Sequence, residues 1–459
     1  MLSGQCDKQK VDRIEQAVTM ADPQKVIFHD GSSHKDARWI TLAGCFLSYC
    51  FDAVDFMILA LALPAIVTDF GFSLGEAGLI GTAGMIGVGF SSLLLGWYAD
   101  NYGRRPALIV SVLIFALFTM AIAVARGWWD MLLLRFLAGL GLGGVWGIVS
   151  ALINETWPPH LRARASAFVL SAGPAGFVLA ALLAHALLPD YGWRALFLSG
   201  GTALFAIIFV AVFVPESSQW REGKAQRQMA SGKQTVSLSE IFIEGRWRRT
   251  VLATSIAACA LTGYWGANTW LPTYLVKERG LEPAAMTTFL IVMNIGMFIG
   301  YQIFGFVADR IGSKKTILFC FAATTILLPV YALIRDLTLL LWFGPLMAMF
   351  FAYFGIFGAY FSALFPAHIR STGAGFCFNV GRGISAFAPF ALGEIATSFS
   401  LSVSIALCGV FFLLAGLLMP LMPDLNMKDE EQTIAPRKPV LAEDPQLSAT
   451  PDFSPYKRS

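Results

Sequence analysis

The sequence predicts an all-α integral membrane protein with twelve transmembrane helices in two pseudo-symmetric six-helix bundles. Three observations lead to this prediction. Of the 459 residues, 56% are hydrophobic and only 14% are charged, against about 25% charged in soluble domains. Apolar runs of membrane-spanning length recur along the chain, and two motifs of the first half return 209 and 208 residues later. One buried core cannot absorb so much apolar surface, so lipid must cover most of it.

The expected spans are helices rather than strands. A helix needs about 20 mostly apolar residues to cross a bilayer, and runs such as 108–124 are almost continuously apolar, without the alternation of a membrane strand. In the first half the spans are expected at 39–67, 77–99, 106–125, 131–153, 165–188 and 194–214. In the second half they are expected at 249–275, 286–308, 315–334, 337–361, 372–397 and 400–421.

The segments between the spans predict the domains and the orientation. Residues 39–214 and 249–421 are expected to form the two bundles, joined by a polar cytoplasmic linker at 215–248. Fifteen Lys and Arg residues lie in or beside the even-numbered gaps, against five in the odd-numbered gaps. Because Lys and Arg favour the cytoplasmic side, both termini are expected there. Residues 1–38 then form a cytoplasmic segment, and the polar, Pro-containing tail at 422–459 is expected to be disordered.

Two motifs occur once in each half. Residues 96–105 read GWYADNYGRR and residues 305–315 read GFVADRIGSKK. Residues 158–162 read PPHLR and residues 366–370 read PAHIR. This repetition predicts two halves of the same design, related by an axis along the membrane normal, with a cavity between them.

Residues 96–105 resemble the signature loop G-x-x-x-D-x-x-G-R-[RK] that follows helix 2 in the major facilitator superfamily. The resemblance covers about residues 39–421, and three further elements agree with it. They are the segment from Arg135 to Gly141, which looks like the helix 4 motif, Glu155 with Arg162, and residues 215–217 (PES) after helix 6. The resemblance implies the major facilitator fold and a transporter rather than an enzyme.

The two related loops and their surroundings supply an expected gate. Gly103 permits a tight turn with positive φ, Asp100 can accept hydrogen bonds from a helix N-terminus, and arginines bind carboxylates or helix C-termini. The expected gate residues are Asp100, Gly103, Arg104, Arg105, Glu155, Arg162, Asp309, Lys314 and Arg370. We call the ion-pair contacts of each loop a latch. Because Ser313 stands in the second loop where the first has Arg104, the latch of the second loop is expected to be weaker. The alternative is that these charges only set the topology.

Ionisable residues at membrane depth are expected to carry the transport chemistry, since each costs about 2.5–3.5 kcal/mol to insert. Asp52 and Asp55 share a face of the first span at i, i+3 spacing, so their repulsion favours a proton on one of them. Alternatively, each aspartate is permanently paired with a cation, either Arg135 or Arg382. We expect Asp52, Asp55 and Arg135 to couple protons, and Arg382 to bind a substrate carboxylate through its planar guanidinium.

Polar and aromatic side chains complete the expected cavity. Tyr264 and Asn268 share a face at i, i+4 spacing, and Trp146 is expected to stack on a ring-bearing or sugar-like solute. The residues expected to bind substrate with Arg382 are Asn379, Tyr264, Asn268, Trp146, Asn294 and Gln302. The alternative for each aromatic residue is packing or a place in an interfacial belt.

The composition excludes several classes of function. The net charge is only +3, and the basic residues lie in short clusters between apolar runs, so no nucleic-acid binding is expected. The seven cysteines are scattered without a CxxC pair, which predicts neither a metal site nor a disulfide framework. No cofactor is expected. The expected partners are a small organic anion, protons and the lipid bilayer, with the monomer as the functional unit in the plasma (inner) membrane.

The sequence of the first expected span resembles particular groups within the superfamily. Residues 49–57 (YCFDAVDFM) resemble the helix 1 motif of sialate:proton symporters, aromatic acid:proton symporters and muconate transporters. Residues 215–248 are too short and polar for the two extra spans that bacterial sialate carriers tend to have. The resemblance implies a secondary active transporter that imports a small organic acid by proton symport and alternating access, and it leaves open which carboxylate. The alternatives are a proton-driven efflux carrier of the same fold and an uncoupled facilitator of a neutral metabolite.

Overall fold

The computed structural model describes residues 34–72, 74–231, 237–243 and 245–425, and all regular structure in these ranges is helical. The first half contains α2 (His34–Phe70), α3 (Leu74–Tyr102), α4 (Arg104–Ile122), α5 (Trp128–Thr156), α6 (Arg162–Leu170), α7 (Ala172–Ser199) and α8 (Leu204–Phe213). The second contains α10 (Arg246–Lys277), α11 (Pro283–Ile311), α12 (Ser313–Leu333), α13 (Leu337–Met349), α14 (Tyr353–Ala363), α15 (Arg370–Ser385), α16 (Ala388–Ser398) and α17 (Leu401–Leu418). The predictions for 1–33 and 426–459 lie outside the described residues.

The described helices provide the twelve predicted crossings. Ten segments are long and apolar enough to cross a membrane. One of them, Pro159–Phe213, has 55 residues, more than twice the roughly 20 that one crossing needs. Gly192 interrupts it with φ 72° and ψ −178°, so it contains two crossings. A further crossing consists of α15 and α16, which a turn at 386–387 separates and which together cover the expected span at 372–397.

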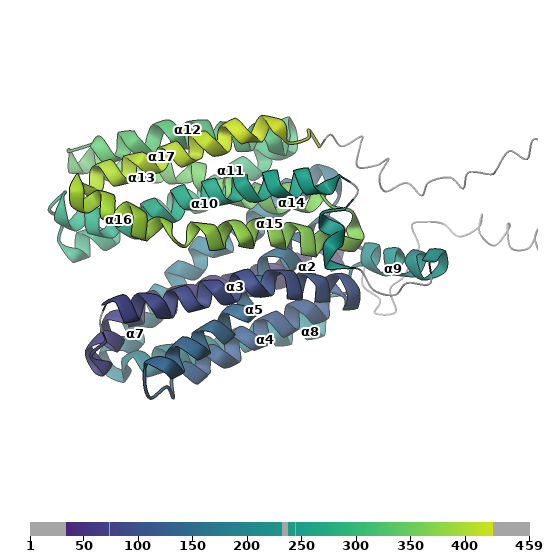
Figure 1. Cartoon of the computed structure of the whole chain (residues 1–459), viewed down its shortest axis with the longest axis horizontal. Coiled ribbons are helices and arrows are strands. Elements are labelled where there is room, and N and C mark those ends of the chain that lie inside the picture. Colours follow the sequence, from purple (N-terminus) through teal and green to yellow (C-terminus); the bar gives the residue numbers. More distant parts are fainter. Residues whose placement is uncertain (1–33, 73, 232–236, 244, 426–459) are drawn as a thin grey trace, which may run out of the picture. The chain divides into compact units, whose positions relative to one another are not determined.

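The two halves meet at equivalent crossings. Figure 1 shows α3, α4, α5, α7 and α8 in one group of helices and α10 to α17 in another. Between the halves, α3 packs on α15 and α11 packs on α6. A Cβ on Gly96 of α3 would lie 2.8 Å from the Cα of Thr372, and a Cβ on Gly305 of α11 would lie 2.7 Å from the Cβ of Ala167. These glycines hold the same place in the repeated motif, so each half uses one to bring a helix close to the other half.

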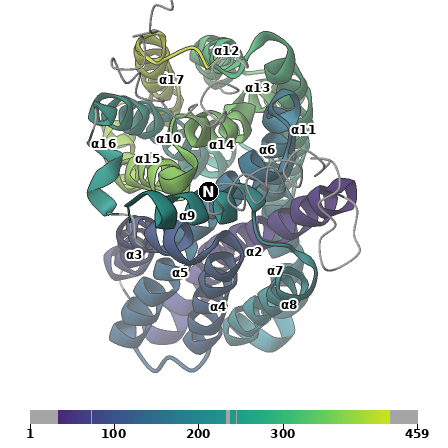
Figure 2. The same cartoon turned by 90° about the vertical axis from the view of Figure 1, so that its right-hand side faces the viewer.

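The linker, expected as a polar connector, contains a helix. This helix, α9 (Ser218–Ser231), contacts α5 in the first half and η5 (Ala367–Ile369) in the second. Figure 2 shows α9 between the helices of the two halves. The indole N–H of Trp220 donates to the carbonyl of Asp100 at 2.8 Å, and Lys224 donates to the carbonyl of Asn101 at 3.2 Å. We call the end of the helices where α9 lies the linker end; the described chain begins and ends there.

Candidate functional site

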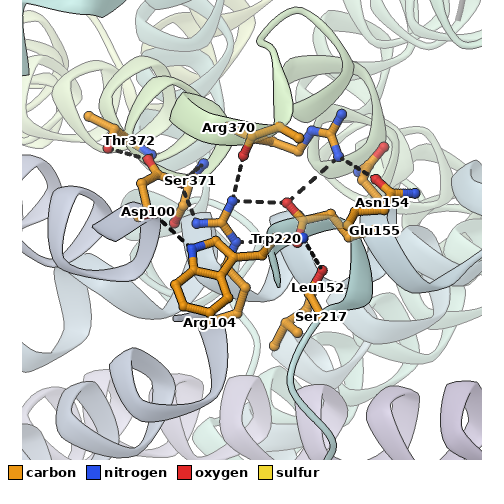
Figure 3. Close-up of polar contacts among 12 residues, drawn as sticks. Asp100, Arg104, Leu152, Asn154, Glu155, Ser217, Trp220, Arg370, Ser371 and Thr372 are labelled. Atoms are coloured by element: carbon orange, nitrogen blue, oxygen red, sulfur yellow. Dashed lines mark hydrogen bonds and ion pairs between the residues drawn. The ribbon is translucent and has the colours of Figure 1, made fainter. Parts of the chain in front are cut away.

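Asp100 joins the two halves at the linker end (Figure 3). It lies near the end of α3 and accepts hydrogen bonds from the backbone N–H groups of Ser371 at 3.3 Å and Thr372 at 2.8 Å. Both donors belong to the first turn of α15, where the helix dipole also favours a negative charge. The hydrogen bonds expected between Asp100 and a helix N-terminus are therefore present, and they cross from one half to the other.

Arg104 compensates the buried carboxylates beside it. Its fully buried guanidinium pairs with Asp100, and its Nη2 lies 2.9 Å from Oε1 of Glu155. The same nitrogen donates to the carbonyl of Ala367 in the second half at 2.7 Å. Nη1 of Arg370, also from the second half, lies 3.7 Å from Oε1 of Glu155. Buried charges are tolerated here because each has a partner of opposite sign and further hydrogen bonds.

The turn between α3 and α4 positions this cluster. Gly103 has a φ of 124°, as its place in the motif predicts, and lets α4 begin at Arg104, directly after α3 ends. The carboxylate of Glu216 accepts the N–H groups of Arg104 at 2.9 Å and Arg105 at 3.2 Å, which satisfies the first turn of α4. Burial raises the pKa of Glu216, while hydrogen bonds from the backbone N–H groups of Ser217 and these two arginines oppose that rise.

The second copy of the motif keeps the hydrogen bonds and lacks the buried cation. Asp309 accepts the N–H groups of Ala163 at 3.0 Å and Arg164 at 3.3 Å, near the start of α6. Its ion pair is with Arg164 at 3.4 Å, whose side chain is 45% exposed, whereas Arg104 is fully buried. Ser313 occupies the place of Arg104 and carries no charge. That the second latch is weaker stays a prediction, because these contacts give its geometry and not its strength.

The remaining expected gate residues lie at the same end. Each donates a hydrogen bond there: Arg105 to the carbonyl of Ala211, Lys314 to that of Met422 at 2.7 Å, Arg162 to that of Trp157 at 3.1 Å, and Arg370 to the side chain of Gln219 at 3.3 Å. Arg105 and Lys314 thus bind backbone near the ends of the last crossings of their halves, as expected for cations at helix C-termini. All the expected gate residues lie at this end of the helices, and their action as a gate stays a prediction.

The two aspartates of α2 have different surroundings. Oδ2 of Asp55 lies 2.9 Å from Nη1 of Arg135 on α5, and the hydroxyl of Thr119 donates to its Oδ1. Asp55 is therefore paired with a cation inside the first half, which is the alternative left open from the sequence. Oδ1 of Asp52 is buried and has no hydrogen-bond partner in the described part of the chain. The i, i+3 spacing does not produce two equivalent carboxylates.

Asp52 lines a cavity between the two halves. The empty volume is about 550 Å³, open solvent at its mouth included. The lining is largely aromatic and consists of Tyr49, Asp52, Ala53, Phe56, Gly173, Pro174, Phe177, Leu261, Tyr264, Trp265, Met297, Tyr301, Phe354, Phe378 and Arg382. Asp52 and Arg382 are the charged members of this set, one from each half. In the described ranges no group of three His, Cys, Asp or Glu side chains is placed to hold a metal ion.

Arg382 brings a cation to this cavity from α15. Its guanidinium carbon lies 4.9 Å from the centroid of the Phe56 ring on α2, a distance typical of a cation–π contact. Its Nε is buried without a hydrogen-bond partner among the described residues, and no ion pair joins it to Asp52 within that part of the chain. A buried guanidinium with unused donors is a site for a carboxylate.

Of the other residues expected to bind substrate, some lie at the cavity and some do not. Tyr264 lines the cavity. Three amides do not line it, and each donates to a carbonyl one turn earlier on its own helix: Asn268 to Tyr264, Asn294 to Leu290 and Gln302 to Phe298. Side chains that bond their own backbone in this way look like cavity residues in the sequence. Trp146 and Asn379 lie next to the cavity wall, because Trp146 stacks on Phe378 and Asn379 follows Phe378 in α15.

Most of the aromatic lining was not predicted from the sequence. Phe177, Tyr301, Phe354 and others are aromatic residues in apolar spans, where packing and lipid contact produce the same pattern. One signal was present. Tyr49 and Phe56 lie three residues before and four residues after Asp52, so the three side chains share one face of α2.

The sequence profile of the Major Facilitator Superfamily matches residues 45–376. The chain belongs to this superfamily. The cis,cis-muconate transport protein of Acinetobacter baylyi is 30% identical over 398 residues, which are 84% of this chain and 95% of that protein. The sialic acid transporter NanX of Escherichia coli is 28% identical over 377 residues, 81% of this chain and 90% of that protein.

Solved structures show the same fold. The proton:xylose symporter XylE, bound to 6-bromo-6-deoxy-D-glucose, superposes with a TM-score of 0.71 over 85% of this chain and 97% of its own, at 17% identity. At that identity the likeness concerns the fold alone. The predicted major facilitator fold is therefore confirmed, as is the resemblance to organic-acid carriers of this superfamily. The protein is a multi-pass membrane transporter and not an enzyme.

The two latches differ in burial, which predicts different costs of removing their cations. Arg104→Gln leaves Asp100 and Glu155 buried without their main cation, which costs about 3–5 kcal/mol. Arg164→Gln removes a half-exposed partner of Asp309, which costs about 0–1 kcal/mol. Thermal melting of the purified proteins in detergent is expected to show a clearly lower midpoint for Arg104→Gln than for the wild type, and little change for Arg164→Gln. Equal shifts would contradict the difference inferred from burial.

Proposed function

We propose that this transporter imports a small organic anion together with a proton, by alternating access. The observation that carries the proposal is the pair of charges on the cavity wall. Asp52 from the first half and Arg382 from the second face one cavity, and no ion pair joins them. Each has a buried atom without a hydrogen-bond partner among the described residues. One chain supplies both charges, so the proposed functional unit is the monomer.

Charge balance gives the coupling. In the empty cavity an ionised Asp52 offsets Arg382. When a carboxylate binds Arg382 and a proton binds Asp52, the cavity is again neutral. With only the anion or only the proton, one charge is left uncompensated in a low-dielectric site, which is costly. The halves therefore rearrange in the empty and the doubly loaded states, and the proton gradient drives the anion inward.

Two further observations support the substrate and the direction. The relatives named above are, by their names, transporters of muconate and of sialic acid, and both of these are organic acids. The linker end carries most of the Lys and Arg residues of the short loops, which favours the cytoplasmic side of a plasma (inner) membrane. A linker end closed at the cytoplasm suits a carrier that receives its substrate from outside.

The proton role of Asp52 is tested in liposomes that contain a pH-sensitive dye. External lactate, muconate, hydroxybenzoate or sialate is added in turn, and one of them is expected to acidify the lumen only when the protein is present. Asp52→Asn is expected to abolish this acidification and accumulation while anion exchange continues, since Asn binds no proton. Asp69→Asn, which changes an exposed carboxylate outside the cavity, is the control. Acidification by the Asp52→Asn protein would contradict the proposal.

The anion role of Arg382 is tested through the apparent KM for the same acid. Hydrogen bonds to a charged group contribute about 1.5–3 kcal/mol, so Arg382→Gln is expected to raise the KM by about tenfold or more. Arg382→Lys keeps the charge and loses the planar fork, so it is expected to raise the KM less. A KM that stays unchanged in Arg382→Gln would remove this residue from the binding site.

A further inference from the structure

Behind one wall of the cavity, two aromatic rings from opposite halves lie face to face. Phe378 of α15 lines the cavity, and the ring of Trp146 of α5 lies 4.0 Å from it, centroid to centroid, with 5° between the planes. Trp146 is only 2% exposed. Phe378 and Arg382 are four residues apart on α15, so they share a face. This ring pair thus lies one helical turn from the cation of the cavity, toward the linker end.

The ring pair is the first contact that separates the cavity from the linker end. Gly375 lies one turn before Phe378 on α15, toward that end, and Gly147 directly follows Trp146 on α5. The two backbones are in close contact there, since a Cβ on Gly147 would lie 2.8 Å from the Cα of Gly375. Beyond it come the hydrogen bonds between Asp100 and Thr372. Any path from the cavity to the linker end between these helices therefore begins by parting Trp146 from Phe378.

Polar atoms beside the rings lack partners in this conformation. Asn379 donates its amide to the carbonyl of Gly143 at 2.9 Å, again between the halves, and its Oδ1 is buried without a hydrogen-bond partner in the described ranges. The indole Nε1 of Trp146 is also buried without a hydrogen-bond partner among the described residues. Buried polar atoms without partners are rare because they lose their hydrogen bonds to water. Two of them next to one contact indicate a place that water or a ligand occupies in another conformation.

We propose that the Trp146–Phe378 stack is the inner gate of the cavity, and that Trp146 and Asn379 form a second anion site when it opens. This inference rests on the proposed function and adds the shape of the substrate. A flat, conjugated carboxylate takes the place of Phe378 on the face of Trp146. Its carboxylate accepts the Asn379 amide N–H that the carbonyl of Gly143 has released. The anion then passes from Arg382 to this site on its way to the cytoplasm.

The second site is tested by measuring the KM from each side of the membrane. Right-side-out and inside-out vesicles with the full-length protein are supplied with 4-hydroxybenzoate, which is flat, and with lactate, which is not. Trp146→Ala is expected to raise the KM for 4-hydroxybenzoate about tenfold from the linker side and to leave it within about twofold from the opposite side. Trp146→Phe keeps a smaller aromatic face for stacking, so its rise in KM is expected to be smaller. Lactate transport, where present, is expected to show no such asymmetry.

Equal rises on both sides would place Trp146 in the central site, and no rise on either side would remove it from binding; both results overturn the second site. If the wild-type protein carries no anion in either direction, the proposed function fails and the second site with it. The gate is then decided by a measurement that needs no substrate.

That measurement is the alkylation of a cysteine introduced one turn beyond the stack. Ser150 of α5 is buried, and the rate at which a maleimide labels Ser150→Cys from the linker side, read by mass spectrometry of the peptide, reports opening of that end. Adding Phe378→Ala is expected to raise the rate about tenfold, because the stack no longer holds α5 against α15. Phe321→Leu, in the core of the second half, is the control. An unchanged rate in the Phe378→Ala protein would overturn the gate.

Discussion

The conformation of this transporter depends on the buried guanidinium of Arg104. It holds Asp100 and Glu155 in the first half and the carbonyl of Ala367 in the second, while Asp100 binds the first turn of α15. Because the three charged side chains are fully buried, opening this end exposes several charges at once, and a partial opening leaves some of them unpaired. A contact of this kind favours two discrete arrangements over a continuous range. The glycine at position 96 contributes by letting α3 and α15 touch.

The cavity differs from this cluster, since its two charged side chains form no ion pair with any described residue. Asp52 and Arg382 stand in an aromatic lining without an ion pair between them, whereas Asp55, one turn from Asp52, is fully engaged by Arg135 and Thr119. Among the described residues, the same helix thus carries one carboxylate with an ion pair and one without; the predicted proton-coupling role of Asp55 and Arg135 stays a prediction. A free acid and a free cation on opposite halves form the arrangement in which a proton and an anion can be required together.

The fold could be predicted from the sequence because hydropathy, the positive-inside bias and the repeated loop each constrain it independently. The repeat also located Asp100 and its bonds to a helix N-terminus. Cavity residues were harder to predict: Asp52 and Arg382 are conspicuous charges in apolar spans, but Asn294 and Gln302 proved to bond their own helices. Phe177 and Phe354 line the cavity and have no polar side-chain atom, and the partner of Asp55 depends on the rotation of α5 against α2. Sequence spacing fixes which face a side chain occupies, and only packing determines what that face meets.

The central claim is that binding of the anion at Arg382 and of the proton at Asp52 are linked. Isothermal titration calorimetry in buffers of different ionisation enthalpy measures this linkage directly, as the number of protons taken up when a transported carboxylate binds the purified protein. The account predicts an uptake of about one proton per anion by the wild-type protein, near neutral pH, and about none by Asp52→Asn. Anion binding by the wild-type protein without proton uptake would contradict it.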